Sequence, residues 1–419
     1  RYFFFAFIFL LPLQTVYLLR EVFVGGEKWQ YGSVLIYVSD IILLFSIIAF
    51  IFSSWRDLTL QVTRYKLQGT SLALLILWAG LSALWAPDQM LAGYFFVKLL
   101  LAAGVFFLAR SLSDEDVKIA IKLLIIGAVL ESLLGAWQFL SQSTFASTLL
   151  GMSAHEVAEA GTSVLKGWHQ RWLRAYGTLP HPNMLGGYLA AVFVLCIGYY
   201  VSCIEELKRN QRIIFLAGLV VILFGLVVTF SRSAWLGAAM GIAVYYVSRI
   251  RYHVWGKLDT QMLLILEIAT IAFAGLFHDL VGLRFDSVAI VREGSVSERV
   301  QSLEDAKTII GEGNILLGAG AGNFTTEMMR LQPGRPVWNI QPAHNIPILV
   351  FAELGLIGLM LFLGFLVSIL APILKSKIIN HTSAILVVLL PILFLDHYLW
   401  TSHFGLFFLF LLLGLASRK

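Results

Sequence analysis

Long apolar runs recur along the whole chain and limit its fold more than any other feature. Twelve runs approach the length of about 20 residues that crosses a bilayer as a helix. They lie at about 2–19, 32–52, 70–86, 91–109, 118–140, 184–203, 212–230, 232–248, 261–277, 345–373, 382–397 and 403–417. Charged residues form only 13% of the chain, against about 25% in soluble domains. We therefore predict an all-α polytopic membrane protein, a single integral-membrane domain over residues 1–419 with about twelve transmembrane helices, the first run being a retained span.

Lysines and arginines gather in every second connection between these runs, which predicts the orientation in the membrane. The basic connections and the C-terminal tail hold Arg56, Arg64, Lys66, Arg110, Lys118, Lys208, Arg209, Arg212, Arg249, Arg251, Lys257, Lys375, Lys377, Arg418 and Lys419. We expect these on the cytoplasmic side, together with both termini. The outer face then receives a smaller loop at 141–183 and a large one at 278–344, between the ninth and tenth spans. The net charge of +5 is ordinary for this topology and does not indicate nucleic-acid binding.

His344 stands at the end of the larger outer loop, directly before a long apolar run, 345-NIPILVF-351. The tenth span should begin near Asn345, because Pro347 is tolerated in a first helical turn but not deeper. A helix N-terminus disfavours a second positive charge, so the imidazole should be neutral and usable as a general base near pH 7. The alternative is an interfacial histidine that only caps the helix.

Two arginines at the outer face suit a diphosphate, because the guanidinium fork binds phosphate oxygens in pairs and stays charged. Arg232 is the only charge in the tight turn before the eighth span. Arg299 lies in 295-SVSERVQSLEDAKTII-310, where apolar residues repeat at helical spacing and Ser295 with Glu298 fits a capping box, so an amphipathic helix is predicted. Solvated arginines, one snorkelling at the membrane edge and one paired with an acid, are the alternative.

Asp396 lies at the outer end of the eleventh span, where an ionisable group is costly and usually paired or functional. It could orient a histidine or hold an arginine. At the entry to the sixth span, 181-HPN-183 fits a kinked start with Asn183 as the N-cap. His181 and Asn183 could also reach a ligand from there.

The segment 166-KGWHQRWLRAYG-177 interleaves basic and aromatic residues, as in an interfacial helix on anionic head groups. Arg171 and Arg174 are the candidates there for binding a phosphorylated lipid. The nine histidines show no metal-ligand spacing, and no acidic pair stands in an outer loop to hold Mg²⁺, so no metal and no cofactor are expected. The run 318-GAGAG-322 follows a helix rather than a strand and is interpreted as a turn.

These segments together resemble the O-antigen ligase and O-antigen polymerase superfamily. The resemblance rests on 231-SRSAWL-236, the helix with Arg299, 317-LGAGAGNF-324, 344-HNIPILVFAELGLIG-358, 181-HPN-183 and the Asp396 segment. It covers about 180–405, and the first five spans add only hydropathy. It implies a multispanning glycosyltransferase of the bacterial inner membrane that acts at the periplasmic face on a lipid-diphosphate donor, without a nucleotide sugar or an essential metal.

Within this superfamily the sequence favours an O-antigen ligase, which moves O-antigen from undecaprenyl diphosphate to lipid A-core. The twelve runs, the dominant outer loop and the basic-aromatic segment agree with an acceptor that is a phosphorylated lipid in the same leaflet. In this scheme Arg232 and Arg299 bind the diphosphate, His344 accepts the proton of the acceptor hydroxyl, and Asp396 holds His344 or an arginine. Direct attack would invert the anomeric carbon.

Three other readings stay open at this point. A polymerase or an O-linked protein oligosaccharyltransferase of the same superfamily would share each feature. A lipid-linked glycan transporter is expected to show broken helices with charges at the midplane and two related halves, whereas the candidate charges here gather at the outer face. A scaffold protein would tolerate alanine at all four candidate catalytic residues.

Overall fold

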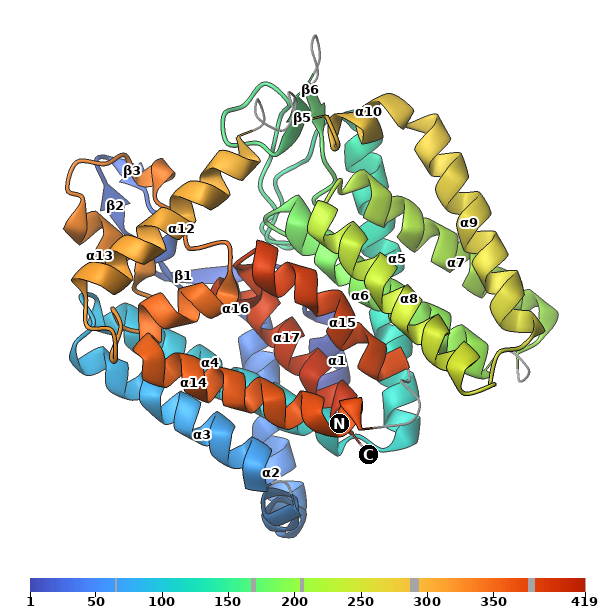
Figure 1. The fold of residues 1–419 in the computed structure, drawn as a ribbon, viewed down its shortest axis with the longest axis horizontal. Helices are drawn as coiled ribbons and strands as arrows, with labels where there is room; N and C mark the ends of the chain where they lie inside the picture. The colour runs from blue at the N-terminus through green and yellow to red at the C-terminus, as the bar shows by residue number, and fades with distance from the viewer. Residues whose placement is uncertain (65, 167–170, 204–206, 287–293, 376–380, 419) are drawn as a thin grey trace.

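The computed structural model describes residues 1–64, 66–166, 171–203, 207–286, 294–375 and 381–418. Helices form most of this part of the chain, and short antiparallel strand pairs lie in the connections between them (Figure 1). The two ends of the described chain lie close together, because Arg1 pairs with Asp116 and Arg418 pairs with Asp114.

Seven helices within the described residues are long and apolar enough to cross a membrane. They are α3 (Lys66–Leu81, continued by η2, Ser82–Leu84), α4 (Gln89–Ser111), α5 (Asp114–Ser141), α6 (Pro182–Cys203), α7 (Arg209–Val228), α9 (Lys257–Leu276) and α14 (Ile346–Leu374). Other predicted runs hold α2 (Val38–Arg64), α8 (Arg232–Arg251), α15 (His381–Leu395) and α17 (His403–Ala416). Helices satisfy their own backbone groups, as a bilayer requires. This is the architecture of a polytopic helical membrane protein, while the number twelve stays a prediction.

The first apolar run does not form one helix, and the prediction of a continuous first span is wrong. Helix α1 covers only Tyr2–Leu10, about 14 Å at 1.5 Å per residue. Pro12 follows Leu11, which still has helical backbone angles, and a proline has no amide N–H to continue the helical hydrogen bonds. The second half of the run instead forms strand β1 (Val16–Arg20), which pairs antiparallel with β4 (Val34–Tyr37). Apolar residues alone did not distinguish helix from strand here.

Helix α17 forms the centre of the bundle, because every side chain from His403 to Ala416 is buried. It packs along α4, while α15 packs against α6 and α8. Buried residues of these helices belong to one continuous hydrophobic core. The core therefore fixes the ends of α6, α8, α14 and α15 relative to one another, and the candidate site lies at those ends.

Helix α14 is interrupted at Gly355, whose backbone is left-handed at φ +67°. The amides of Ala319 and Gly320 donate to the carbonyls of Ala352 and Glu353, at 2.9 and 2.7 Å. A side chain at Gly355 would place Cβ 2.2 Å from the carbonyl oxygen of Leu316. Glycine is therefore required by both conformation and close approach. The glycine-rich run at 318–322 is a turn, as predicted, and the structure adds that it hydrogen-bonds to the interrupted part of α14.

The two long connections are partly structured. The smaller one contains β5 (Val164–Lys166) and β6 (Arg171–Leu173), which pair antiparallel. The interfacial helix predicted at 166–177 is therefore wrong where the chain is described, and residues 167–170 lie outside the described part. The larger connection contains α10 (His278–Leu283), α12 (Ser295–Glu312), α13 (Phe324–Leu331) and η4 (Val337–Asn339). Helix α12 confirms the predicted helix, although its N-cap is Gly294 and not Ser295.

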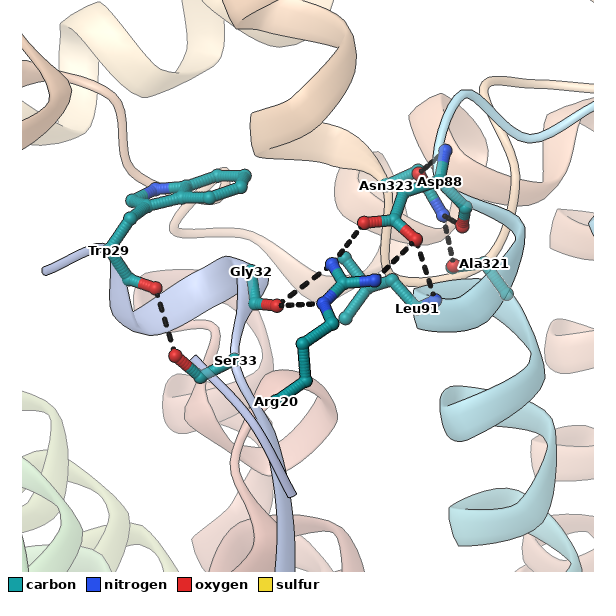
Figure 2. Close-up of polar contacts among 8 residues, drawn as sticks. All are labelled: Arg20, Trp29, Gly32, Ser33, Asp88, Leu91, Ala321 and Asn323. Carbon is teal, nitrogen blue, oxygen red and sulfur yellow. Dashed lines mark hydrogen bonds and ion pairs between the residues drawn. The ribbon is translucent and has the colours of Figure 1, made fainter. Parts of the chain in front are cut away.

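A polar clamp ties three of the connections between helices together (Figure 2). The Arg20 guanidinium donates to both carboxylate oxygens of Asp88 and to the carbonyl of Gly32. Asp88 also caps α4 by accepting from the Leu91 amide at 3.0 Å, and its own amide donates to Asn323 at 2.8 Å. Asn323 begins α13. The paired guanidinium and the cap hold the pKa of Asp88 below its ordinary value, with burial opposing. The clamp thereby holds the loop before α14 in place.

Candidate active site

Titratable side chains from four separate segments meet where membrane helices begin or end. His181 precedes α6, Arg299 lies on α12, His344 precedes α14, and Asp396 and His397 follow α15. The rings of His344 and His397 stand nearly perpendicular, with centroids 4.8 Å apart. The structure thus brings together three residues that were predicted as a catalytic group, His344, Arg299 and Asp396.

Asp396 is the buried centre of this group, with 5% of its surface exposed. One carboxylate oxygen accepts a hydrogen bond from the Asn183 side-chain amide at 2.8 Å, and the other accepts from the His397 backbone amide at 2.9 Å. Burial alone would raise the pKa of Asp396. The surrounding His397, His344 and His181 and the charge of Arg299 outweigh burial and hold that pKa below its ordinary value. Asp396 is therefore an anion around neutral pH.

His344 lies immediately before the N-cap of α14. Asn345 is that N-cap, since its side chain accepts from the Ile348 amide at 3.1 Å and Pro347 lies in the first turn, so the predicted helix start is confirmed. The His344 backbone amide donates to Ser302 Oγ at 3.3 Å, and the ring Nδ1 lies 3.2 Å from the same oxygen. Helix α12 therefore fixes the ring through Ser302, a contact the sequence did not reveal.

The Ser302 hydroxyl determines which nitrogen of His344 is available. It also lies 2.9 Å from the carbonyl of Arg299, to which it donates. A hydroxyl has one proton, so Nδ1 of His344 must then carry its own hydrogen and donate to Ser302 Oγ. Neutral histidine with a protonated Nδ1 has its lone pair on Nε2. This arrangement leaves Nε2 as the basic nitrogen.

Burial lowers the pKa of His344 below its ordinary value of 6.5. The negative charge of Asp396 acts in the opposite direction, and the positive charge of Arg299 adds to the lowering. Burial also lowers the pKa of His181 and of His397. All three imidazoles are therefore neutral near pH 7, which is the state that a general base requires.

His181 hydrogen-bonds mainly to backbone groups at the start of α6. Its Nδ1 accepts from the Asn183 amide at 3.0 Å, and its Nε2 lies 2.9 Å from Ser163 Oγ. Its carbonyl accepts the amides of Met184 and Leu185. His181 therefore starts α6, and the prediction of Asn183 as the N-cap is wrong because Pro182 already lies inside the helix.

The Asn183 side chain instead connects Asp396 to a buried arginine. Its oxygen accepts from Arg174 Nη2 at 2.7 Å, while its nitrogen donates to Asp396. Arg174 Nε donates to the carbonyl of Thr229 at 2.7 Å. Arg174 is 5% exposed, so it does not face lipid head groups as its sequence context predicted. It links the α7–α8 turn, which precedes Arg232, to the titratable group.

Arg232 is the first residue of α8, after the N-cap Ser231. Its guanidinium Nη1 lies 3.5 Å from the carbonyl of Arg284. Arg284 is buried and donates through Nε and Nη2 to the carbonyl of Phe230, at 2.8 and 2.6 Å. Phe230 has a positive φ of 48°. Arg284, which sequence reasoning missed, thus fixes the turn that carries Arg232.

Arg299 and Asn345 are both attached to the end of α15. Arg299 Nε donates to the carbonyl of Leu395 at 3.2 Å, and Asn345 Nδ2 donates to that of Phe394 at 3.3 Å. These carbonyls end α15, where helical partners are absent. The two bonds attach α12 and α14 to the segment that carries Asp396.

Arg171, predicted to bind a phosphorylated lipid, stands apart from the titratable group. It is exposed on β6, and its Nη2 lies 3.4 Å from the carbonyl of Glu159. The sequence signal for Arg171 and Arg174 was the same, a basic residue among aromatic ones. Tertiary packing distinguishes the two arginines: Arg171 is exposed, whereas Arg174 is buried and bonds to Asn183.

His344, Asp396 and His397 together could hold a metal ion, because one ligand atom from each lies within 4.8 Å of the others. Residue spacing along the chain did not predict this group. Both Asp396 oxygens already accept hydrogen bonds, and His397 Nδ1 lies 2.7 Å from Thr401 Oγ1. The charge of Arg299 acts against a cation as well. These contacts favour proton transfer over metal binding.

Comparison with known proteins gives a family match for the middle of the chain. Residues 217–363 match the family model described as O-Antigen ligase. The matched range contains Arg232, Arg299 and His344, whereas Asp396, Asn183 and Arg174 lie outside it. No curated protein gives a significant match to the sequence.

Proposed function

We propose, from the match of residues 217–363 to the O-Antigen ligase family model, that this protein is an O-antigen ligase: it transfers O-antigen from undecaprenyl diphosphate to a sugar hydroxyl of lipid A-core. The reaction takes place at the periplasmic face of the inner membrane, with both termini in the cytoplasm. One observation carries the proposal: a neutral histidine, His344, is fixed beside a buried carboxylate and an arginine at helix ends.

His344 is the general base in this proposal. Its Nε2 takes the proton of the acceptor hydroxyl as the oxygen forms a bond to the anomeric carbon of the donor sugar. The bond between that carbon and the diphosphate oxygen breaks, and undecaprenyl diphosphate leaves with the electron pair. Asp396 stabilises the imidazolium that forms. A single displacement of this kind inverts the anomeric configuration.

The diphosphate binds to arginines and to a helix end. Arg232 starts α8, so the positive end of the helix dipole and the guanidinium present positive charge together. Arg299 adds a second guanidinium beside His344 and Asp396. Fixed donors that meet the charge of a leaving group lower the barrier without reorganisation. Asn345 and Asn183 position these groups, and the chemistry requires no metal.

The pH dependence of transfer follows from His344. We expect the rate to fall on the acid side with a midpoint below 6.5, the ordinary histidine value, because protonation removes the base. Asp396→Asn should move this midpoint further toward acid, since the carboxylate raises the pKa of His344. The rate is measured at saturating donor and acceptor from about pH 5 to pH 9. A midpoint above 6.5 would contradict the assignment.

Acid unfolding must be separated from this effect. The folded-state pKa of His181 and of His397 lies below 6.5. Their contribution to stability is therefore complete above pH 6.5 and is lost as the pH falls below it. Melting temperature, recorded at each pH, shows where unfolding begins, and only rates from folded protein enter the profile.

The direct test uses purified full-length protein in detergent with undecaprenyl-diphosphate-linked O-antigen and lipid A-core, in EDTA and without nucleotide. We expect a ladder of glycan joined to lipid A-core. Lengthened donor without transfer to core would identify a polymerase. Loss of the ladder in EDTA with recovery on adding Zn²⁺ would assign His344, Asp396 and His397 to a metal. Movement of donor across vesicles without any covalent product would support a transporter.

A further inference from the structure

A polar cavity of about 310 Å³ lies between α12 and the segment that leads to His344. It is separate from the arginines of the site. Its lining residues are Ser297, Glu298, Gln301, Ser302, Asp305, Arg335, Trp338, Asn339 and Gln341. The volume is at the lower end of the range for ligand sites, about 300–1,000 Å³. It suits a small part of a substrate.

Asp305 lines the cavity, and one of its two carboxylate oxygens accepts no hydrogen bond from the described residues. The residue is 2% exposed, and its Oδ1 accepts from Arg335 Nη1 at 2.7 Å and from Gln301 Nε2 at 3.1 Å. Its Oδ2 is buried without a hydrogen-bond partner among the described residues. A buried acceptor without a partner costs free energy. A ligand hydroxyl in the cavity would supply the missing donor.

Trp338 gives the cavity an apolar, aromatic surface. It is 62% exposed, although it lines the cavity and belongs to the short η4 turn. Arg335 holds that turn by donating to the carbonyl of Asn339 as well as to Asp305. An exposed ring on a fixed turn beside carboxylates and amides combines an apolar face with hydrogen-bonding groups. A sugar ring offers the matching pair, an apolar face of C–H groups and a rim of hydroxyls.

The charge of the lining argues against a phosphate. Glu298 and Asp305 are two carboxylates, and Arg335, the one guanidinium in the lining, already bonds to Asp305. An anion would meet net negative charge there. The donor diphosphate therefore belongs with Arg232 and Arg299, and the cavity suits an uncharged sugar.

Ser302 places the cavity on one particular side of His344. It lines the cavity and contacts Nδ1 of His344. The same ring contacts His397, with centroids 4.8 Å apart. Next to His397, Asp396 continues through Asn183 and Arg174 to the Thr229 carbonyl, in the turn before Arg232. His344 is thus linked by direct contacts to the cavity and, through this chain of hydrogen bonds, to the arginine turn.

We propose that this cavity binds an uncharged sugar residue of the acceptor glycan, stacked on Trp338 and hydrogen-bonded to Asp305 Oδ2. The inference rests on the proposed function and adds to it the position at which the acceptor glycan binds. Trp338 and Asp305 determine acceptor specificity, and neither residue takes part in proton transfer.

The test compares steady-state constants of full-length protein for lipid A-core and for the lipid-linked donor. Trp338→Ala should raise the KM for lipid A-core about tenfold or more, with the donor KM unchanged. Trp338→Phe keeps an aromatic face and should stay within about threefold. Asp305→Asn should raise the same KM, whereas Glu304→Gln, an exposed neighbour on α12, should not. Melting temperature identifies any variant that fails to fold.

A second measurement separates sugar contacts from lipid contacts. The lipid-free core oligosaccharide should inhibit the wild type in competition with lipid A-core, and Trp338→Ala should need about tenfold more of it. An unchanged acceptor KM in Trp338→Ala, or a raised donor KM in its place, would overturn the inference while leaving the ligase intact. Absence of transfer by the wild type would instead refute the proposed function.

Discussion

Replacement of His344 by alanine is expected to lower the transfer rate about 10²–10⁴-fold, the usual contribution of a general base. The KM values for donor and acceptor should change little, because the imidazole acts on a proton that moves only in the transition state. Single-turnover rates with preloaded donor measure this loss directly. The variant should stay folded, since Asn345 still caps α14 and Asp396 keeps its bonds to Asn183 and to the His397 amide.

The matched control is His278→Ala. His278 lies on α10 in the same large connection, its side chain is 76% exposed, and its ion-pair partner Asp279 is exposed as well. This variant should transfer at the wild-type rate. A His344→Ala protein that keeps more than about a tenth of the wild-type rate would remove the base from the mechanism. His344 would then be a histidine that only supports the start of the helix.

Replacement of Arg232 by alanine should lower the transfer rate about 10²–10³-fold, as the loss of a fixed charge-stabilising donor does. Arg232→Lys should recover only part of this loss, because an ammonium retains the charge but not the fork that meets two phosphate oxygens. The helix N-terminus stays intact in both variants. Inhibition by inorganic diphosphate should be weaker in Arg232→Lys than in the wild type, and weakest in Arg232→Ala. This measurement distinguishes a loss of leaving-group binding from misfolding of the turn.

Arg251→Ala is the control for Arg232. Arg251 is the last residue of the same helix, α8, and it is exposed, with its guanidinium 5.8 Å from the Tyr252 ring. An exposed cation–π contact contributes only about 0.5–1 kcal/mol, so this variant should behave as the wild type. Equal activity in Arg232→Ala and Arg251→Ala would mean that the diphosphate binds elsewhere, with Arg299 the remaining candidate at the site.

The catalytic assignment and the acceptor cavity depend on the same helix. Helix α12 contacts His344 through Ser302 and bonds to the end of α15 through Arg299. The same helix supplies Asp305 to the lining of the cavity. Its buried face carries Ser302 and Asp305 beside apolar Ala306 and Ile309. The outward face holds Val300, which is apolar but 51% exposed. The buried polar residues are hydrogen-bonded, Ser302 to His344 and Asp305 to Arg335.

Features determined within a few residues could be predicted from the sequence. The apolar runs predict helices, since only internal backbone bonds are tolerated in a bilayer. Asn345 with Pro347 predicts a helix start, because a side-chain cap acts within one turn. The position of His344 followed from that start. Local rules failed at 2–19, where the same apolar composition fits helix or strand.

Only the tertiary structure decided which side chains share the site. Asn183 and Asp396 bond across 213 positions of sequence, and Ser302 reaches His344 across 42. Nothing local distinguishes Arg174, buried against Asn183, from Arg171, exposed on the same hairpin. The sequence determined most of the helices and the start of α14, because those follow from contacts between near neighbours. The pairing of their ends depends on how the bundle packs around α17, which no single segment contains.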